Sequence, residues 1–72
     1  MKKLKKDIGS ILQKYRVEAG YSQGDMQNIT GITRNHLSAV ERGLFKLNMR
    51  TLLTYIDVCH IPVSEFFEKG EI

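Results

Sequence analysis

Apolar residues recur at three- and four-residue spacing along the first twenty positions, which is the period of an amphipathic helix. Gly20 is expected to end this helix, because glycine adopts the left-handed conformation at a helix C-terminus without a steric penalty. The residues predicted to form the inward face are Leu4, Ile8, Ile11, Leu12, Tyr15 and Ala19.

A second short helix is predicted to begin after Ser22. Asp25 stands three residues later, and this spacing is that of a capping box, in which two side chains cap a helix start. Gly31 is expected to break the helix. Its inner face would be supplied by Met26 together with either Ile29 or Thr30.

The third helix is predicted to follow Thr33, whose hydroxyl caps its first turn. Leu37, Val40 and Glu41 fall on one side of this helix and are expected to face inward. Gly43 would end it. The segment from 22 to 42 therefore predicts two short helices joined by a tight turn.

Two more helical segments are predicted in the last third of the chain. Asn48 would cap a fourth helix, and Pro62 stands where a short fifth helix should begin. Val63, Phe66 and Phe67 are expected to fold back onto the core. The inward residues of the fourth helix are predicted to be Leu52, Leu53, Ile56 and Cys59.

No segment shows the alternating pattern of a strand, so the predicted fold is all-α, a compact bundle of about five short helices. With 72 residues the chain forms one domain. Such a domain buries only about 60% of its unfolded surface, so oligomerisation would stabilise it. The expected organisation is a basic N-terminal extension over 1–7, the domain over 8–69 and a tail over 70–72.

Charge is distributed unevenly along the chain. The net charge is +3, but residues 1–50 hold ten Lys and Arg against four Asp and Glu, a net charge of +6. Residues 51–72 hold one Lys against four acidic residues, a net charge of −3. A basic body favours a polyanionic partner.

The third helix carries side chains that can bind a polyanionic partner such as DNA. Gly31 supplies the positive φ that a tight turn needs, and the major groove of DNA is wide enough to accept one α-helix. Arginine can bond guanine through two hydrogen bonds, and asparagine can bond adenine in the same way. The residues predicted to lie opposite or beside the core-facing side are Arg34, Asn35, Ser38, Ala39 and Arg42.

These features together resemble the Cro/repressor type of helix-turn-helix domain, the XRE-like family of bacterial and phage transcription regulators, with a lambda-repressor-like fold. The resemblance covers about Ile8 to Phe67. It is carried by Arg16, Gly20–Gln23, Thr30–Arg34, Leu37–Ser38, Val40–Gly43, Thr51–Leu53 and Ser64–Phe67.

The resemblance implies roles for individual residues. Arg16 and Glu41 would form an internal ion pair between the first and third helices, and Gln23 would both contact phosphate and brace the third helix. The implied base-reading residues are Arg34, Asn35, Ser38 and Ala39. The implied phosphate-contacting residues are Ser22, Gln23, Thr33, His36, Arg42 and Lys46.

The chain departs from the family pattern in three places. Gln27 replaces a residue that is usually small, so either the two helices lie further apart or its side chain reaches the third helix or DNA. Ile29 occupies a position that is usually polar. The apolar residues Leu44, Phe45 and Leu47 replace a polar loop, which indicates either a contact surface or local packing.

The function predicted from this pattern is that of a sequence-specific transcriptional regulator of double-stranded DNA, a repressor that binds a palindromic operator as a homodimer. Its half-sites would lie about 34 Å apart. The predicted dimer interface consists of Phe45, Val63, Phe66 and Phe67. Two alternatives remain open, namely an antitoxin-like or adaptor module that docks a protein partner, and the controller protein of a restriction-modification system.

Other classes of function have little support. Cys59 is the single cysteine, so no internal disulfide can form, and the thiol fits a reducing cytoplasm. His36, Cys59 and His60 lack zinc-binding spacing, so no metal or other cofactor is expected. No nucleophile, base and orienting group occur together, so an enzyme is not expected. No secretory signal or membrane segment is predicted either.

Overall fold

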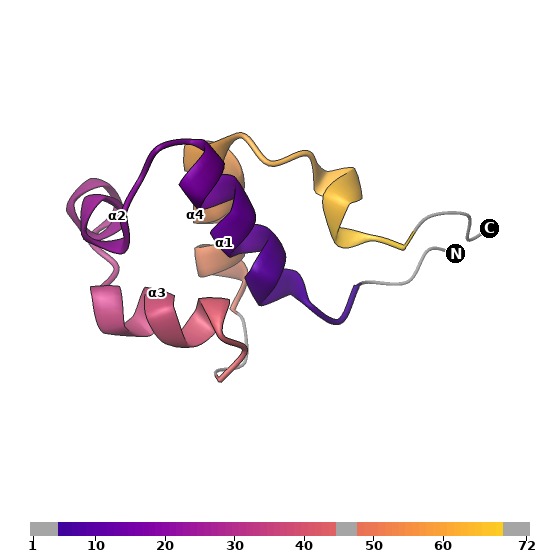
Figure 1. Cartoon of the computed structure of the whole chain (residues 1–72), viewed down its shortest axis with the longest axis horizontal. Helices are drawn as coiled ribbons and strands as arrows, with labels where there is room; N and C mark the ends of the chain where they lie inside the picture. The colour runs from indigo at the N-terminus through magenta and orange to yellow at the C-terminus, as the bar shows by residue number, and fades with distance from the viewer. Residues whose placement is uncertain (1–4, 45–47, 69–72) are drawn as a thin grey trace.

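The computed structural model describes residues 5–44 and 48–68, and these ranges contain four α-helices, one short 3-10 helix and no strand. Figure 1 shows the chain in the order α1, α2, α3, α4 and then the 3-10 helix η1. The elements are α1 (Ile8–Glu18), α2 (Gln23–Thr30), α3 (Arg34–Glu41), α4 (Met49–Cys59) and η1 (Val63–Phe66). The all-helical prediction is confirmed, but the fifth element is a single 3-10 turn.

The 3-10 turn follows Pro62, which adopts an extended conformation at its start. Its hydrogen bonds span three residues, from the Glu65 N–H to the Pro62 carbonyl at 3.0 Å and from the Phe67 N–H to the Ser64 carbonyl at 3.2 Å. The Lys5 N–H also donates to the Phe66 carbonyl at 2.8 Å. The described start of the chain is therefore tied to η1.

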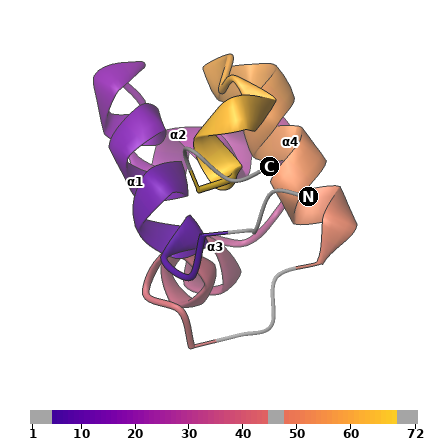
Figure 2. The same ribbon diagram turned by 90° about the vertical axis from the view of Figure 1, so that its right-hand side faces the viewer.

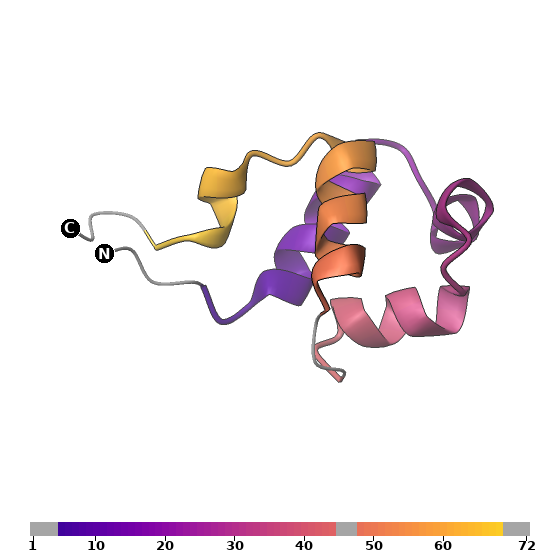
Figure 3. The same ribbon diagram turned by 180° about the vertical axis from the view of Figure 1, so that it is seen from behind.

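The helices form two groups around the core. Figures 1 and 3, from opposite sides, show α1 and α4 packed together in the middle of the molecule. The pair α2 and α3 lies at one end and η1 lies at the other. The core consists of Ile11, Leu12, Met26, Leu37, Val40, Tyr55, Cys59, Ile61 and Phe66.

The predicted end of α1 is confirmed. Gly20 has a φ of +87°, its N–H donates to the Val17 carbonyl, and the Tyr21 N–H donates to the Arg16 carbonyl at 3.1 Å. These two bonds form a Schellman motif, which satisfies carbonyls that the helix end leaves unpaired. The helix stops at Glu18, and Ala19 is consequently exposed, contrary to the inward position predicted for it.

The inward face of α4 differs from the one predicted. Thr51, Tyr55 and Cys59 are buried, and Leu53 is 55% exposed. The prediction that Leu53 faces the core is therefore wrong. The physical reason is that the Tyr55 hydroxyl reaches a buried carboxylate in the core, and this contact sets the rotation of α4 about its axis.

Gly9 allows α1 to approach α3 closely. A Cβ atom at this position would lie 2.6 Å from the Val40 carbonyl oxygen and 2.7 Å from the Glu41 carbonyl oxygen. Only a residue without a side chain fits there, since both neighbours are backbone atoms. The C-terminal end of α3 is thus supported directly by the first turn of α1.

Candidate nucleic-acid interface

The turn between α2 and α3 is fixed by local hydrogen bonds. Gly31 has a φ of +79°, and its N–H donates to the Gln27 carbonyl at 2.8 Å. The Thr30 hydroxyl donates to the Met26 carbonyl at 2.7 Å and accepts from the Ile32 N–H at 3.1 Å. Of the two residues considered for the inner face of α2, Thr30 is half-buried and Ile29 is 51% exposed, so Thr30 takes this position.

The start of α2 has the predicted capping box. The Ser22 hydroxyl accepts from the Asp25 N–H, and the Asp25 carboxylate accepts from the Ser22 N–H, each at 2.9 Å. These hydrogen bonds from Ser22 lower the pKa of Asp25 below its ordinary value. The capping box stabilises the first turn of α2, which carries Ser22 and Gln23 at its exposed end.

The start of α3 is capped by two side chains. The Thr33 hydroxyl accepts from the His36 N–H at 3.3 Å, as predicted. In addition, the Gln27 side-chain oxygen accepts from the Arg34 N–H at 2.6 Å. Among the alternatives predicted for Gln27, the structure shows a side chain that reaches α3. The Gln27 amide oxygen therefore pairs with one of the N–H groups that a helix start leaves unpaired.

The other end of α3 is held by Glu41, which is buried beneath the helix. Arg16 of α1 donates to both carboxylate oxygens of Glu41, from Nε at 2.8 Å and from Nη2 at 3.0 Å. Gln23 of α2 donates to the same carboxylate at 3.2 Å, and the Tyr55 hydroxyl of α4 donates to it at 2.5 Å. One buried carboxylate therefore links all four α-helices.

The ion pair between Arg16 and Glu41 that the family resemblance implied is part of this network. Arg16 also donates from Nη1 to the Tyr21 carbonyl at 2.7 Å, which ties the α1–α2 connection to the same cluster. Among the described residues, no buried side-chain polar atom lacks a hydrogen-bond partner. Tyr55 is absent from the inward face that the sequence predicts for α4, because the smaller apolar residues of the helix define that face.

The network also shifts the ionisation of its members. Burial alone would raise the pKa of Glu41, but hydrogen bonds from Arg16, Tyr55 and Gln23 outweigh it and lower the pKa below its ordinary value. Burial, followed by the hydrogen bond to the Glu41 carboxylate, raises the pKa of Tyr55 well above its ordinary value. Glu41 is thus held as a carboxylate and Tyr55 as a neutral hydroxyl donor.

We expect the lowered pKa of Glu41 to make folding sensitive to acid. A carboxyl group whose pKa is lower in the folded state adds stability above its unfolded pKa, and that stability is lost as the pH falls. Urea unfolding of the wild type should therefore show a falling free energy below about pH 4.5.

Glu41→Gln should be less stable at pH 7 and should lose less of its remaining stability on acidification. Glu18→Gln, which changes an exposed carboxylate of α1, is the matched control and should follow the wild type. Equal acid sensitivity in Glu41→Gln and the wild type would contradict this assignment.

The outward face of α3 carries most of the predicted base-reading residues. Arg34 and Asn35 are exposed and Ser38 is half-buried. Ala39 is only 7% exposed, so the prediction that it faces outward is wrong. The methyl group of Ala39 extends only a short way from the backbone, so it is covered more easily than a longer side chain at the same position. After it, Gly43 takes the left-handed conformation, and the bonds from the Gly43 N–H to the Val40 carbonyl and from the Leu44 N–H to the Ala39 carbonyl end α3 in a Schellman motif.

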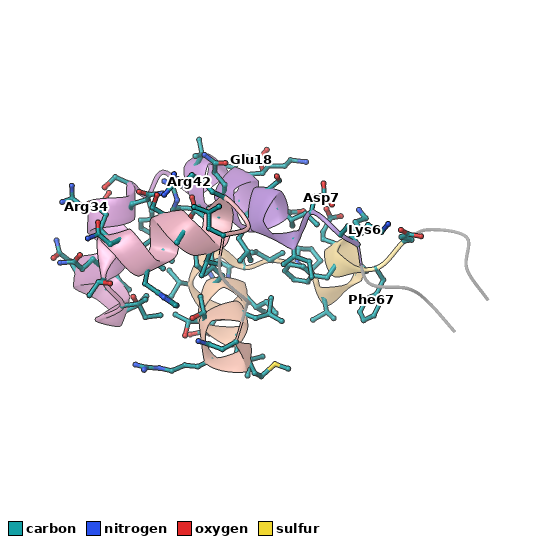
Figure 4. All side chains as sticks on the ribbon, turned by 90° about the horizontal axis from the view of Figure 1, so that it is seen from below. Lys6, Asp7, Glu18, Arg34, Arg42 and Phe67 are labelled. Atoms are coloured by element: carbon teal, nitrogen blue, oxygen red, sulfur yellow. The ribbon has the colours of Figure 1, made fainter. Side chains whose placement is uncertain are left out.

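The predicted phosphate-contacting residues lie around this face. Ser22, Thr33 and Arg42 are exposed, and Gln23 and His36 are half-buried. Figure 4 shows Arg34 and Arg42 along α3 when the molecule is viewed from below. Lys46 lies outside the described residues.

The residues predicted to form the dimer interface differ in how exposed they are. Val63 is exposed and Phe67 is half-buried. Phe66 is 2% exposed and belongs to the core, so the prediction that it offers surface to a partner is corrected. Phe45 lies outside the described residues.

Within the described ranges there is no group of three or more His, Cys, Asp or Glu side chains that could hold a metal ion. None of the described helices is long and apolar enough to span a membrane.

The chain was compared with protein-family models, with curated proteins and with solved structures. A family model described as Helix-turn-helix (HTH_3) matches residues 12–66, which is well over half of the chain. No curated protein and no solved structure matches the chain. The matched range contains α2, the turn at Gly31 and α3, together with the Arg16–Glu41 ion pair and Tyr55.

Proposed function

The chain belongs to the Cro/repressor type of helix-turn-helix family, and from this premise we propose that it is a sequence-specific transcriptional regulator. It binds double-stranded DNA and acts as a repressor at a palindromic operator, as a homodimer. The observation that carries the proposal is the exposure of Arg34 and Asn35 on a helix that is capped at its start and anchored at its end.

The base-reading residues in this proposal are Arg34, Asn35 and Ser38. Arginine and asparagine are the side chains that make paired hydrogen bonds to guanine and adenine in the major groove. Ser38 lies one turn after Arg34 on the same side of α3 and is small enough for close approach. Ala39 is not included, because its methyl group is covered.

The phosphate contacts in this proposal surround α3. The N-terminus of α2 supplies Ser22 and Gln23, the start of α3 supplies Thr33 and His36, and Arg42 follows its end. The positive end of a helix dipole favours phosphate, and arginine can bond phosphate through two N–H groups. Lys46 remains a proposed member from the sequence alone.

Replacing Arg42 with alanine should weaken binding to all duplex sequences alike. Each phosphate contact releases bound counterions, so losing one should reduce the slope of log K against log salt by about one. Fluorescence anisotropy with a labelled duplex at four salt concentrations measures this slope. Lys14→Ala removes a positive charge from an exposed position of α1 that is not among the proposed contacts, and it should keep the wild-type slope. An unchanged slope in Arg42→Ala would remove this residue from the contacts.

The proposed homodimer has a surface available beside α4. An apolar groove of about 370 Å³ lies there, lined by residues of α4 and η1, which are drawn next to each other in Figure 2. Every described residue that lines it is apolar. The lining residues are Met49, Leu52, Leu53, Ile56, Val63, Phe66 and Phe67.

A second copy of the chain is the occupant we propose for this groove. Met49, Leu53 and Val63 are each more than half exposed, and a small domain gains stability by burying such residues against a partner. The groove is separate from the outward residues of α3, so a copy bound there leaves Arg34 and Asn35 uncovered. Two recognition helices can then serve the two halves of one operator.

Leu53→Glu should convert the dimer to a monomer. A carboxylate buried without a partner at the interface should raise the dimer dissociation constant by at least about tenfold. Sedimentation equilibrium over a range of protein concentrations measures this change. Val17→Glu alters an equally exposed apolar residue on α1 and should keep the wild-type dissociation constant. A dimer that tolerates Leu53→Glu, or a monomeric wild type, would contradict the assignment of this groove.

A further inference from the structure

Arg34, the first residue of α3, is held by α2 at two separate points. The first is its backbone, whose N–H donates to the Gln27 side-chain oxygen at 2.6 Å. Gln27 is exposed and lies on the last full turn of α2, so this bond spans the helix-turn-helix from outside. It fixes the position from which the Arg34 side chain starts.

The second point is the Arg34 guanidinium group, which lies against Gly24. A Cβ atom at Gly24 would be 3.4 Å from Nη2 of Arg34 and 3.9 Å from its Cζ. The same Cβ position is 3.6 Å from the Ser22 hydroxyl oxygen. The guanidinium group therefore extends back over the first turn of α2, into space that a longer side chain at Gly24 would occupy.

Gly24 and Gln27 are three residues apart and so share one side of α2, the side that meets Arg34. Gly24 has no positive φ, so the backbone conformation of α2 does not require glycine at this position. The missing side chain of Gly24 leaves the space beside which the Arg34 guanidinium group lies. Both residues act on Arg34, one through the backbone and one through the guanidinium group.

We infer that Gly24 and Gln27 are positioning residues that set the base preference of Arg34. This inference rests on the proposed function. A paired contact between arginine and guanine requires the planar guanidinium group to meet the base edge in one orientation. Gln27 fixes the backbone position from which the Arg34 side chain extends. The space at Gly24 lets the Arg34 guanidinium group pass beside Ser22 at the edge of the DNA major groove. Changing either residue redirects the arginine and changes which base it reads.

The test compares base preference in three variants. Arg34→Ala first identifies the base pair that Arg34 reads, by competition between the best duplex and duplexes changed at one position. Gly24→Gln, which fills the space with a neutral side chain, should reduce the preference at that base pair about tenfold. Ile29→Gln changes an exposed residue elsewhere on α2 and should keep the wild-type preference.

Gln27 is tested by a conservative rescue. Gln27→Ala removes the acceptor for the Arg34 N–H and should reduce the same preference. Gln27→Glu keeps an acceptor oxygen, so it should retain the preference while its charge weakens binding to all sequences alike. Circular dichroism melting checks that each variant folds, and Gly24→Gln should fold well because glutamine favours helix more than glycine does.

The outcomes separate this inference from the proposed function. A wild-type chain without any base preference would overturn the proposed function and the inference with it. A wild-type preference that Arg34→Ala abolishes, but that Gly24→Gln and Gln27→Ala leave intact, would overturn the inference alone. Loss of the preference in both variants, with retention in Ile29→Gln and Gln27→Glu, supports it.

Discussion

Replacing Arg16 with methionine should lower the free energy of unfolding by about 3–5 kcal/mol, because it leaves the buried Glu41 carboxylate without its charged partner. Single domains of this kind are stable by only about 5–15 kcal/mol. The variant should therefore lose a large share of its stability, and its urea midpoint should fall clearly below that of the wild type. Its remaining hydrogen bonds, from Tyr55 and Gln23, cannot replace the lost charge.

Urea unfolding followed by circular dichroism measures this effect. Arg50→Met makes the same chemical change at an exposed position of α4 and should alter stability by less than about 0.5 kcal/mol. The double variant Arg16→Met with Glu41→Leu should be more stable than Arg16→Met alone, since it removes the stranded charge. Equal stability of Arg16→Met and Arg50→Met would show that the network does not hold the fold together.

Replacing Asn35 with alanine should weaken binding to the best operator by about 1–3 kcal/mol, which is the contribution of one paired base contact. The loss should be confined to duplexes that carry the preferred base at the position Asn35 reads. Folding should not suffer, because Asn35 is exposed and alanine favours helix more than asparagine does. Asn35→Ala should therefore weaken DNA recognition without lowering the stability of the fold.

Fluorescence anisotropy with the best duplex, and with duplexes changed at single positions, measures this loss. Asn28→Ala removes the same side chain from an exposed position of α2 and should bind like the wild type. If Asn35→Ala weakens all duplexes by the same factor, then Asn35 contacts the backbone and not a base.

Features that depend on neighbouring residues in the chain could be predicted from the sequence. The capping box of Ser22 and Asp25, the turn at Gly31 and the cap at Thr33 all have the predicted geometry. The inward positions of α3 follow from the helical period, and Leu37 is fully buried as expected. The Arg16–Glu41 pair came from the family resemblance, and the structure confirms it.

Features that depend on contacts between distant segments could not be predicted in this way. A hydrogen bond from Tyr55 to Glu41 determines which face of α4 turns inward. The spacing of apolar residues along α4 cannot reveal that contact. Ala39 is only 7% exposed although the helical period places it away from Leu37, and the period alone cannot show this. Gly9 has no pattern in the sequence that marks it as a point of close approach between α1 and α3.

We propose that the outward face of α3 reads the major groove of duplex DNA. Selection of bound sites from a random duplex pool, with the wild type and with Asn35→Ala, tests it most directly. We predict a two-fold symmetric motif with half-sites about one helical turn apart, in which Asn35→Ala loses the preference at one position of each half-site. A pool without any enriched motif, or an identical motif from both proteins, would contradict the account.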